Sequence, residues 1–319
     1  MKSHNPEKPF VTVVIPVLNN ALGIIKCLNA LDLQSYPKDA YEVLVIDNGS
    51  KDNIQEVTKG YSQTRLLFED YPSQAAARNK GIINAKGDII AFTDSDCIPA
   101  LDWLEKGVDQ LLRIPDCKYL GGKITVFFQK PEKPTACELY EYIYAFPQKK
   151  YIEEQRFSTT ANLFTRKSLF NDVGLFKKSS YTGSDNEWGN EVYSKGYQQV
   201  YADDVQILHP ARHNWRQLSL KQARIRLSRY RKAIQKKPLS SIRTRLRWII
   251  KTPHLRKFYS QTLDILANQN LVGIMQRVSV IYILLRRLYF DFVIRFSVVY
   301  GIDLKHDYKL LRENTDQNK

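Results

Sequence analysis

The 319-residue sequence contains few cysteines, and they do not form a metal or disulfide motif. Cys27, Cys97, Cys117 and Cys137 are far apart, with no CxxC pair and no histidine at zinc-finger spacing. This pattern excludes a zinc ribbon and a disulfide-stapled secreted domain, and it predicts buried thiols in a reducing compartment. Residues 1–10 are polar and interrupted by proline, so they lack the apolar stretch of a signal peptide. We therefore expect a cytoplasmic protein.

The sequence also lacks an apolar run of the roughly 20 residues that a transmembrane helix requires. The most apolar region, residues 271–302, is interrupted by Arg277, Arg286, Arg287, Asp291 and Arg295. On a helix, all of these except Arg286 fall within one sector of about 80°. Such a helix can lie in a membrane interface, with this charged stripe toward the head groups and an apolar face of Ile281, Leu284, Leu288, Phe292 and Val299. A helix packed on the rest of the protein shows the same pattern.

Acidic residues are missing from residues 205–263, which contain sixteen Lys and Arg. The whole chain has 48 Lys and Arg against 33 Asp and Glu, a net charge of +15, so this stretch carries essentially the entire excess. A basic stretch beside apolar segments suits an anionic membrane surface. It could also bind nucleic acid, but it lacks a recognised nucleic-acid motif. We therefore expect a peripheral membrane protein on the inner face of the cell membrane.

Apolar runs alternate with helical patterns through the first half of the chain. The predicted strands are 10–18, 41–46, 65–68 and 88–93, and the helices between them are 21–33, 53–59 and 73–85. The strands are nearly all apolar, as burial on both sheet faces requires. This alternation predicts an α/β fold with a mostly parallel sheet flanked by helices. Beyond it we expect helices at 103–112 and 136–151 and strands at 119–128, 197–202 and 205–208.

Two carboxylates, Asp94 and Asp96, follow the fourth predicted strand directly. Residues i and i+2 of an extended segment point the same way, so both side chains can converge on one hard cation. Ligands of open α/β sheets bind outside the carboxyl ends of strands, where this pair would lie. The alternative is a solvated turn that caps a helix starting near Pro99.

Three further residues lie where ligand contacts are expected. Asn19 and Asp47 follow the first two strands, and Arg78 lies in an alanine-rich helix. Asp47 could accept hydrogen bonds from a base ring, or it could form an Asx turn before the next helix. Arg78 could supply a bidentate fork for phosphate, or it could be a solvated helical arginine.

With these residues in this order, the chain resembles the family-two inverting glycosyltransferases, which have the GT-A nucleotide-diphospho-sugar fold. The resemblance covers about residues 10–210. It implies that the nucleotide sugar is contacted by Pro16, Val17, Asn19, Asp47, Arg78 and Asp94, with uracil the favoured base for Asp47. It also implies that a divalent metal, Mn²⁺ or Mg²⁺, is bound by Asp96, Asp94 and His209, although a lone histidine is often structural.

The same resemblance implies a catalytic base in residues 181–191, and the matching residue is Asp185. Its place at a helix amino terminus favours the ionised form, but an N-cap would look the same. Ser184 replaces an acidic residue common in the family, and Glu191 stands where many members carry arginine. These departures leave Glu187 as the second candidate.

The resemblance implies inverting transfer of a single sugar from a nucleotide-diphosphate sugar, with UDP-sugar favoured. The basic stretch and the apolar helices, rather than the resemblance, indicate the acceptor, which would be a hydroxyl of a saccharide or lipid-linked saccharide in cell-surface polysaccharide synthesis. Processive synthases of the family carry Gln-x-x-Arg-Trp, which residues 212–216 do not match. We therefore expect a non-processive enzyme.

The expected domains are a catalytic domain at 1–210, a basic and partly amphipathic helical extension at 211–305, and a polar tail at 306–319. The alternative from another class is a non-catalytic protein of nucleotide-sugar fold whose basic arm binds nucleic acid or a partner. A nucleotidyltransferase would need a glycine-rich phosphate loop with lysine near the first strand, and residues 19–23 do not supply one.

Overall fold

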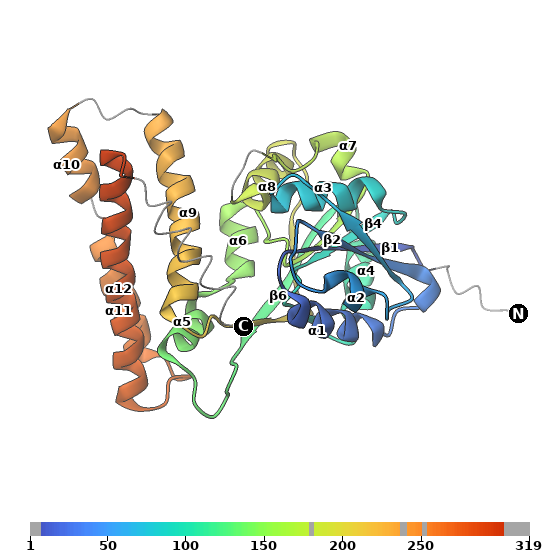
Figure 1. The fold of residues 1–319 in the computed structure, drawn as a ribbon, viewed down its shortest axis with the longest axis horizontal. Coiled ribbons are helices and arrows are strands. Elements are labelled where there is room, and N and C mark those ends of the chain that lie inside the picture. Colours follow the sequence, from blue (N-terminus) through green and yellow to red (C-terminus); the bar gives the residue numbers. More distant parts are fainter. Residues whose placement is uncertain (1–7, 179–181, 237–240, 251–253, 303–319) are drawn as a thin grey trace, which may run out of the picture. The chain divides into compact units, whose positions relative to one another are not determined.

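The computed structural model describes residues 8–178, 182–236, 241–250 and 254–302 (Figure 1). The tail expected at 306–319 lies outside these residues. The chain divides into two compact units, Met1–Val126 with Phe146–Pro210, and Phe127–Ala145 with Ala211–Lys319. The second unit therefore takes in residues 127–145 as well as the C-terminal helices.

The first unit is built on a mixed sheet. Within the described residues eight strands pair in the order β3-β2-β1-β4-β7-β6-β8-β5. Their bounds are β1 (Val11–Val17), β2 (Tyr41–Asp47), β3 (Thr64–Phe68), β4 (Ile89–Thr93), β5 (Ile98–Pro99), β6 (Tyr119–Phe127), β7 (Asn162–Arg166) and β8 (Val200–Pro210). Neighbours among β1 to β4 pair in parallel, whereas β7 is antiparallel to both β4 and β6. The parallel half is the part that the alternating pattern predicted.

Helices cover both faces of this sheet. Val13 belongs to a buried cluster with α1 (Ala21–Asp32), α2 (Ile54–Thr58) and α4 (Trp103–Arg113). Its neighbour Val14 belongs to a second cluster with α3 (Gln74–Asn84), α7 (Leu169–Val173) and α8 (Ser184–Ser194). Successive strand residues point to opposite faces, so an apolar residue at every position fills both clusters. The predicted α/β fold is confirmed, and all four cysteines are buried thiols.

Two predicted elements differ in the structure. The helix expected at 136–151 is divided into α5 (Ala136–Tyr144) and α6 (Gln148–Gln155). Between them Phe146 has a φ of 52°, and Pro147 has no amide hydrogen to continue the α5 hydrogen bonds. The helix expected at 103–112 is confirmed as α4, whereas the alternative helix start near Pro99 is not formed, because Ile98 and Pro99 pair with β8. The two strands expected at 197–208 form one strand, β8.

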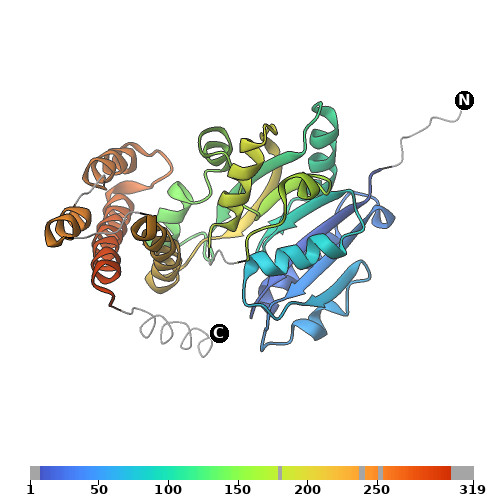
Figure 2. The same cartoon turned by 90° about the horizontal axis from the view of Figure 1, so that it is seen from above.

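The second unit is helical. Besides α5 it contains α9 (Trp215–Lys236), α10 (Ile242–Ile250), α11 (His254–Ala267) and α12 (Gly273–Tyr300), and Figure 2 shows several of these roughly along their axes. α12 contacts the other four helices, and Leu218, Ile265 and Ile283 are among its shared core residues. Among the described residues, no helix has both the length and the apolar character to cross a membrane.

The charged stripe of α12 faces this core, contrary to the expectation that it meets head groups. Asp291 is 3% exposed and Arg295 is 8% exposed. The Asp291 carboxylate accepts hydrogen bonds from Tyr230 Oη at 2.5 Å and from Arg295 Nε at 3.1 Å. Of the face expected to be apolar, Leu284 is buried whereas Phe292 is 47% exposed. Helical spacing shows which residues share a face, but it does not show which face the neighbouring helices cover.

Candidate functional site

The loops after β1, β2 and β4 are joined by side-chain hydrogen bonds. Asn19, in a left-handed conformation, donates its backbone N–H to Ser50 Oγ at 2.9 Å, and its Oδ1 accepts from Lys51 N at 2.8 Å. Asn20 Nδ2 donates to Ser95 Oγ at 2.9 Å. The carboxyl ends of these three parallel strands therefore form one connected polar surface, as expected for a ligand site in an α/β sheet.

Asp47 lies within this surface. Its side chain is bound within the loop that follows, because Oδ1 accepts a hydrogen bond from Ser50 N at 2.9 Å, three residues on rather than the two of an Asx turn. The residue is 7% exposed. Pro16 and Val17 are buried at the end of the neighbouring strand β1, paired with Ile46 and Asp47. Their side chains belong to the sheet, so a ligand at this edge would meet the backbone that follows them.

Arg78 is buried rather than solvated. α3 lies so close to the sheet that a Cβ at Gly81 would come within 2.4 Å of Val14 Cγ1. This close packing leaves Arg78 5% exposed, with Nη2 3.5 Å from Asp94 Oδ1. Its Nε is buried and has no hydrogen-bond partner among the described residues. A buried guanidinium with one long contact retains donors for an anionic ligand.

Asp94 and Asp96 do not converge as an extended segment would place them. β4 ends at Thr93, and Cys97 N then donates to Asp94 O at 3.0 Å, which closes a tight turn. The turn sends the Asp94 carboxylate toward Arg78 and the Asp96 carboxylate toward His209. Side chains at positions i and i+2 point the same way only in an extended strand, and β4 ends before Asp94.

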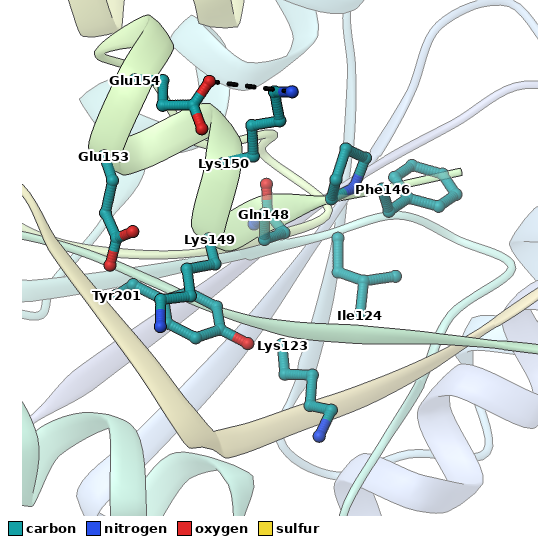
Figure 3. Close-up of a pocket in the computed structure, with 10 residues that line it drawn as sticks. Lys123, Ile124, Phe146, Gln148, Lys149, Lys150, Glu153, Glu154 and Tyr201 are labelled. Carbon is teal, nitrogen blue, oxygen red and sulfur yellow. Dashed lines mark ion pairs between the residues drawn. The ribbon is translucent and has the colours of Figure 1, made fainter. Parts of the chain in front are cut away.

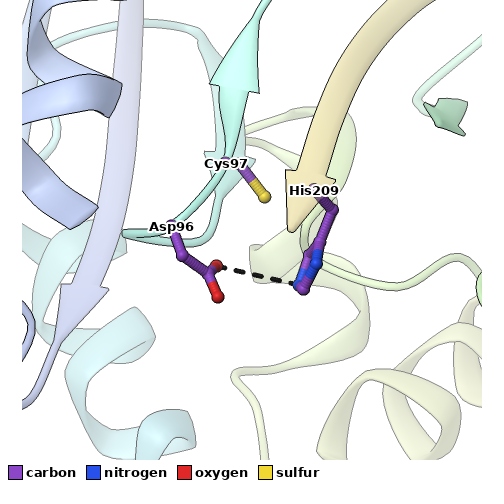
Figure 4. Close-up of side chains that lie close together, drawn as sticks. All are labelled: Asp96, Cys97 and His209. Carbon is purple, nitrogen blue, oxygen red and sulfur yellow. Dashed lines mark ion pairs between the residues drawn. The ribbon is translucent and has the colours of Figure 1, made fainter. Parts of the chain in front are cut away.

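Asp96 and His209 lie together with Cys97 (Figure 4). One potential ligand atom from each of these residues lies within 4.8 Å of the other two, and His209 Nε2 is 3.7 Å from Asp96 Oδ1. His209 Nδ1 lies 2.8 Å from the Pro210 carbonyl oxygen, which can accept but not donate a hydrogen bond. Nδ1 therefore carries the hydrogen, and Nε2 of the neutral ring has a lone pair for a metal.

This donor set fits a hard divalent cation through two of its three members. A carboxylate suits Mn²⁺ or Mg²⁺, an imidazole suits a transition-metal ion better than it suits Mg²⁺, and thiolate ligands suit softer ions. Burial raises the pKa of the Cys97 thiol well above its usual value, and the Asp96 and Asp94 carboxylates add to this effect. Cys97 therefore remains a neutral thiol beside the two donors. Asp94, which the sequence also assigned to the metal, does not belong to this group.

Asp185 is the second residue of α8, the helix that the sequence placed there. Burial raises the pKa of its carboxyl group, the Arg78 guanidinium lowers it, and Asp94 raises it further. The helix terminus contributes a hydrogen bond from Asn186 N to Asp185 Oδ1 at 2.9 Å, but it does not dominate as expected. Glu187 lies half-buried in the same first turn. The structure thus brings Asp185 into electrostatic range of Arg78 and Asp94.

Asn79 positions the segment before α8, a role that the sequence analysis missed. Its Nδ2 donates to Phe176 O at 2.8 Å, and its Oδ1 accepts from Phe176 N at 3.0 Å. Because Asn79 follows Arg78 in α3, this helix contacts the Asp94 side of the site and holds the chain that leads to Asp185. The sequence feature that could have indicated this role is the polar pair Arg78-Asn79 directly after three alanines of a closely packed helix. In the structure both side chains are buried.

A separate open cavity of about 410 Å³ lies between β6, α6 and β8 (Figure 3). Phe146, from the break between α5 and α6, lines it and packs on His209 with ring centroids 4.5 Å apart. Other lining residues include Lys123, Lys149, Glu153 and Tyr201. One aromatic ring thus separates this cavity from the Asp96–His209 pair.

Comparisons with known proteins identify the family. The sequence model of Glycosyl transferase family 2 matches residues 12–174. Glycosyltransferase AglE of Haloferax volcanii is 40% identical over 209 residues, which cover 64% of this chain and 68% of that protein. A dolichyl N-acetyl-alpha-D-glucosaminyl phosphate 3-beta-D-2,3-diacetamido-2,3-dideoxy-beta-D-glucuronosyltransferase of Methanococcus voltae is 27% identical over 205 residues, or 59% of this chain and 63% of that protein.

A solved structure shows the same fold. The mannosyltransferase PcManGT of Pyrobaculum calidifontis, determined with GDP-Man and Mn²⁺, superposes with a TM-score of 0.57 at 17% identity, covering 93% of this chain and 88% of that one. The chain spans about two thirds of the length of the two relatives above. The matched residues include the loops after β1 and β2, α3 and the Asp94–Asp96 turn. The chain belongs to glycosyltransferase family 2 and has the GT-A fold.

Proposed function

We propose that this glycosyltransferase moves one sugar from a nucleotide-diphosphate sugar to an acceptor hydroxyl, with inversion and with a divalent metal. The observation that carries the proposal is the separation of two carboxylate sites. Asp96 pairs with His209 on one side, whereas Asp185 shares its surroundings with Arg78 and Asp94 on the other. Direct displacement needs this division, because charge leaves at one atom while a proton leaves another.

Asp96 and His209 would hold the metal on the leaving-group side. When bound, Mn²⁺ or Mg²⁺ supplies Lewis-acid stabilisation of the departing nucleoside diphosphate. Arg78 presents unused guanidinium donors to phosphate oxygens, and Asp94 keeps that guanidinium in place. The structure of the Pyrobaculum mannosyltransferase contains Mn²⁺ and a nucleotide sugar, which supports the proposal that this protein also binds a divalent metal and a nucleotide sugar.

Asp185 would act as the base on the acceptor side. It would accept the proton of the attacking hydroxyl while the new glycosidic bond forms on the face opposite the departing diphosphate. A carboxylate whose pKa is raised is a stronger base than a solvated one, and it remains useful while it is ionised at the working pH. Glu187, one half-turn further along α8, is the second candidate for this role.

The nucleobase of the donor is proposed from Asp47, and the acceptor is proposed from a relative. Asp47 lies beside the Asn19 loop and favours uridine, so a UDP-sugar is the proposed donor. The Methanococcus relative is named for a dolichyl-phosphate-linked sugar acceptor. We therefore propose a saccharide or lipid-linked saccharide acceptor in cell-surface polysaccharide synthesis, with a single sugar added per encounter.

A thermal-shift panel tests the donor and the metal together. The protein is heated with UDP-, GDP- and dTDP-sugars, each with Mn²⁺ or with EDTA. We expect a UDP-sugar with Mn²⁺ to raise the melting temperature, since a ligand that binds the folded state stabilises it. A shift with none of the sugars, together with salt-sensitive retention of RNA or DNA, would instead support the non-catalytic alternative.

A further inference from the structure

The outward face of α12 carries a long stripe of exposed apolar side chains. The exposed fractions are 76% for Met275, 53% for Val278, 55% for Tyr282, 48% for Leu285, 71% for Tyr289, 47% for Phe292, 42% for Phe296 and 43% for Tyr300. These eight residues, here called the α12 stripe, recur every three or four positions and are therefore neighbours on one helix face. Along the helix axis they extend over about 38 Å. Soluble proteins rarely leave such a continuous apolar surface in water.

The α12 stripe lies on the side of α12 opposite to the side that packs against the other helices. Asp291 and Ile283 lie on the opposite side of α12 and are 3% exposed each. The views in Figures 1 and 2 agree in placing α12 alongside α9, and the two helices are in contact. The helical bundle thus buries the charged side of α12 and leaves the aromatic side exposed. What covers that side must come from outside the described part of the chain.

The charge of the second unit indicates which kind of surface contacts the α12 stripe. Residues 211–302 contain twenty Lys and Arg but only two acidic residues, Asp264 and Asp291. Exposed cations of the same unit include Arg229 and Arg231 of α9, Arg243 and Arg247 of α10 and Arg256 of α11. A second copy would bring an equally basic bundle against this one, whereas an anionic surface would be attracted. Three tyrosines in the stripe also suit a boundary between hydrocarbon and water.

We propose that the α12 stripe docks the protein on a bilayer containing anionic lipid. The aromatic and aliphatic side chains of the stripe enter the head-group boundary, and the Lys and Arg side chains of the same unit contact lipid phosphates. This is an interfacial attachment by a helix that does not cross the bilayer. It does not rest on the proposed sugar transfer, so either proposal can fail alone.

Vesicle sedimentation of the full chain tests the stripe. We expect binding to phosphatidylcholine vesicles that contain phosphatidylglycerol, weak binding to phosphatidylcholine alone, and weakening by salt. The double substitution Tyr289→Ser and Phe292→Ser should lower the vesicle partition coefficient by about tenfold or more. A matched double substitution of exposed apolar residues in the first unit, Leu22→Ser and Ile83→Ser, should change it less than about twofold.

A fluorescence measurement detects insertion without weakening the stripe. The four native cysteines are buried, so a thiol introduced by Tyr289→Cys can be labelled selectively with an environment-sensitive dye. The dye at position 289 should shift to the blue on addition of phosphatidylglycerol vesicles, and a dye introduced by Leu22→Cys should not. An unchanged spectrum at 289, or equal vesicle binding by both serine variants, overturns the proposal. A lipid-free dimer that the stripe substitutions dissociate overturns it in favour of a second copy.

Discussion

Asp185 shows how burial and neighbouring charges adjust a carboxylate for proton transfer. Its pKa is raised first by burial and then by Asp94, and Arg78 limits the rise. Without Arg78 the group would tend to stay protonated and could not accept a proton. The ion pair between Arg78 and Asp94 thus links the phosphate side of the site to the base.

We predict that Asp185→Asn lowers turnover by a hundredfold or more while leaving donor binding intact, as expected for the loss of a positioned base. The same substitution should raise the melting temperature of the ligand-free protein at neutral pH, because it removes a partly desolvated charge. Steady-state kinetics and thermal melts measure the two effects. Glu187→Gln is the control, and if it alone abolishes turnover, Glu187 is the base.

The pH dependence has a defined sign. Since the folded-state pKa of Asp185 is raised above its unfolded value, its contribution to stability is full below the unfolded pKa and is lost as pH rises through the folded pKa. Turnover should change in the opposite sense and increase as Asp185 ionises. We predict an acidic limb in kcat/KM displaced above the ordinary aspartate range. A flat profile across that range would exclude Asp185 as the titrating base.

Several site residues could be predicted from the sequence because they are adjacent to recognisable strands. Asn19, Asp94 and Asp96 follow strands β1 and β4, Asp47 ends β2, and all four lie at the carboxyl ends of these strands. Their partners could not be predicted by spacing, because a turn after Thr93 separates the two carboxylates. Cys97 joins Asp96 and His209 for the same reason.

At the scale of elements, α3 links the phosphate side of the site to the segment that carries the base. Ala75, Ala76 and Ala77, together with Gly81, let this helix approach the sheet and bury its polar residues. Arg78 then reaches Asp94, and Asn79 holds both backbone groups of Phe176. The alanine-rich pattern predicted close packing, but the clamp on Phe176 is a contact between residues 97 positions apart.

We predict that Asn79→Ala lowers the free energy of unfolding by about 1–3 kcal/mol, because it leaves buried backbone groups of Phe176 without partners. Urea unfolding measures the change. Asn171→Ala, at an exposed position of α7, should stay within about 0.5 kcal/mol of the parent protein. Equal effects of the two substitutions would mean that the Asn79 clamp adds no stability.

A buried charge network links α5 to the C-terminal helices. Glu141 is 2% exposed and accepts hydrogen bonds from Arg212 Nη1 at 2.9 Å and from Lys221 Nζ at 3.2 Å. Burial lowers the pKa of Lys221 to about 8, so this lysine depends on the carboxylate to stay charged. The network explains why residues 127–145 group with the second unit, a contact that no local pattern shows.

We predict that Glu141→Gln lowers the free energy of unfolding by about 3 kcal/mol, the lower end for a broken buried pair, because two partly buried cations lose their buried counter-charge. Denaturant unfolding at neutral pH gives the value. The control is Glu154→Gln, whose partner Lys150 is 3.7 Å away and whose side chain is 63% exposed. That control should change stability by less than about 1 kcal/mol. A small loss for Glu141→Gln would show that the cations find other partners.

In the whole molecule, the candidate site residues and the excess of basic residues lie in different units. The first unit contains every residue of the candidate site, and the second contains the uniformly basic stretch and the α12 stripe. The fold of the first could be predicted because it follows a local alternation of strands and helices. The outward face of α12 could not, since its exposure depends on helices far away in the sequence.

Release of nucleoside diphosphate from a UDP-sugar, followed by ³¹P NMR, distinguishes the roles of Asp96 and Asp185. The parent protein, Asp96→Ala and Asp185→Asn are compared in Mn²⁺ and in EDTA with a saccharide acceptor. We expect release by the parent protein in Mn²⁺, loss of release in EDTA, and loss of release in both variants, with nucleotide binding kept by Asp185→Asn alone. Release that persists in EDTA, or that is equal in all three proteins, would contradict the assignment of Asp96 and Asp185.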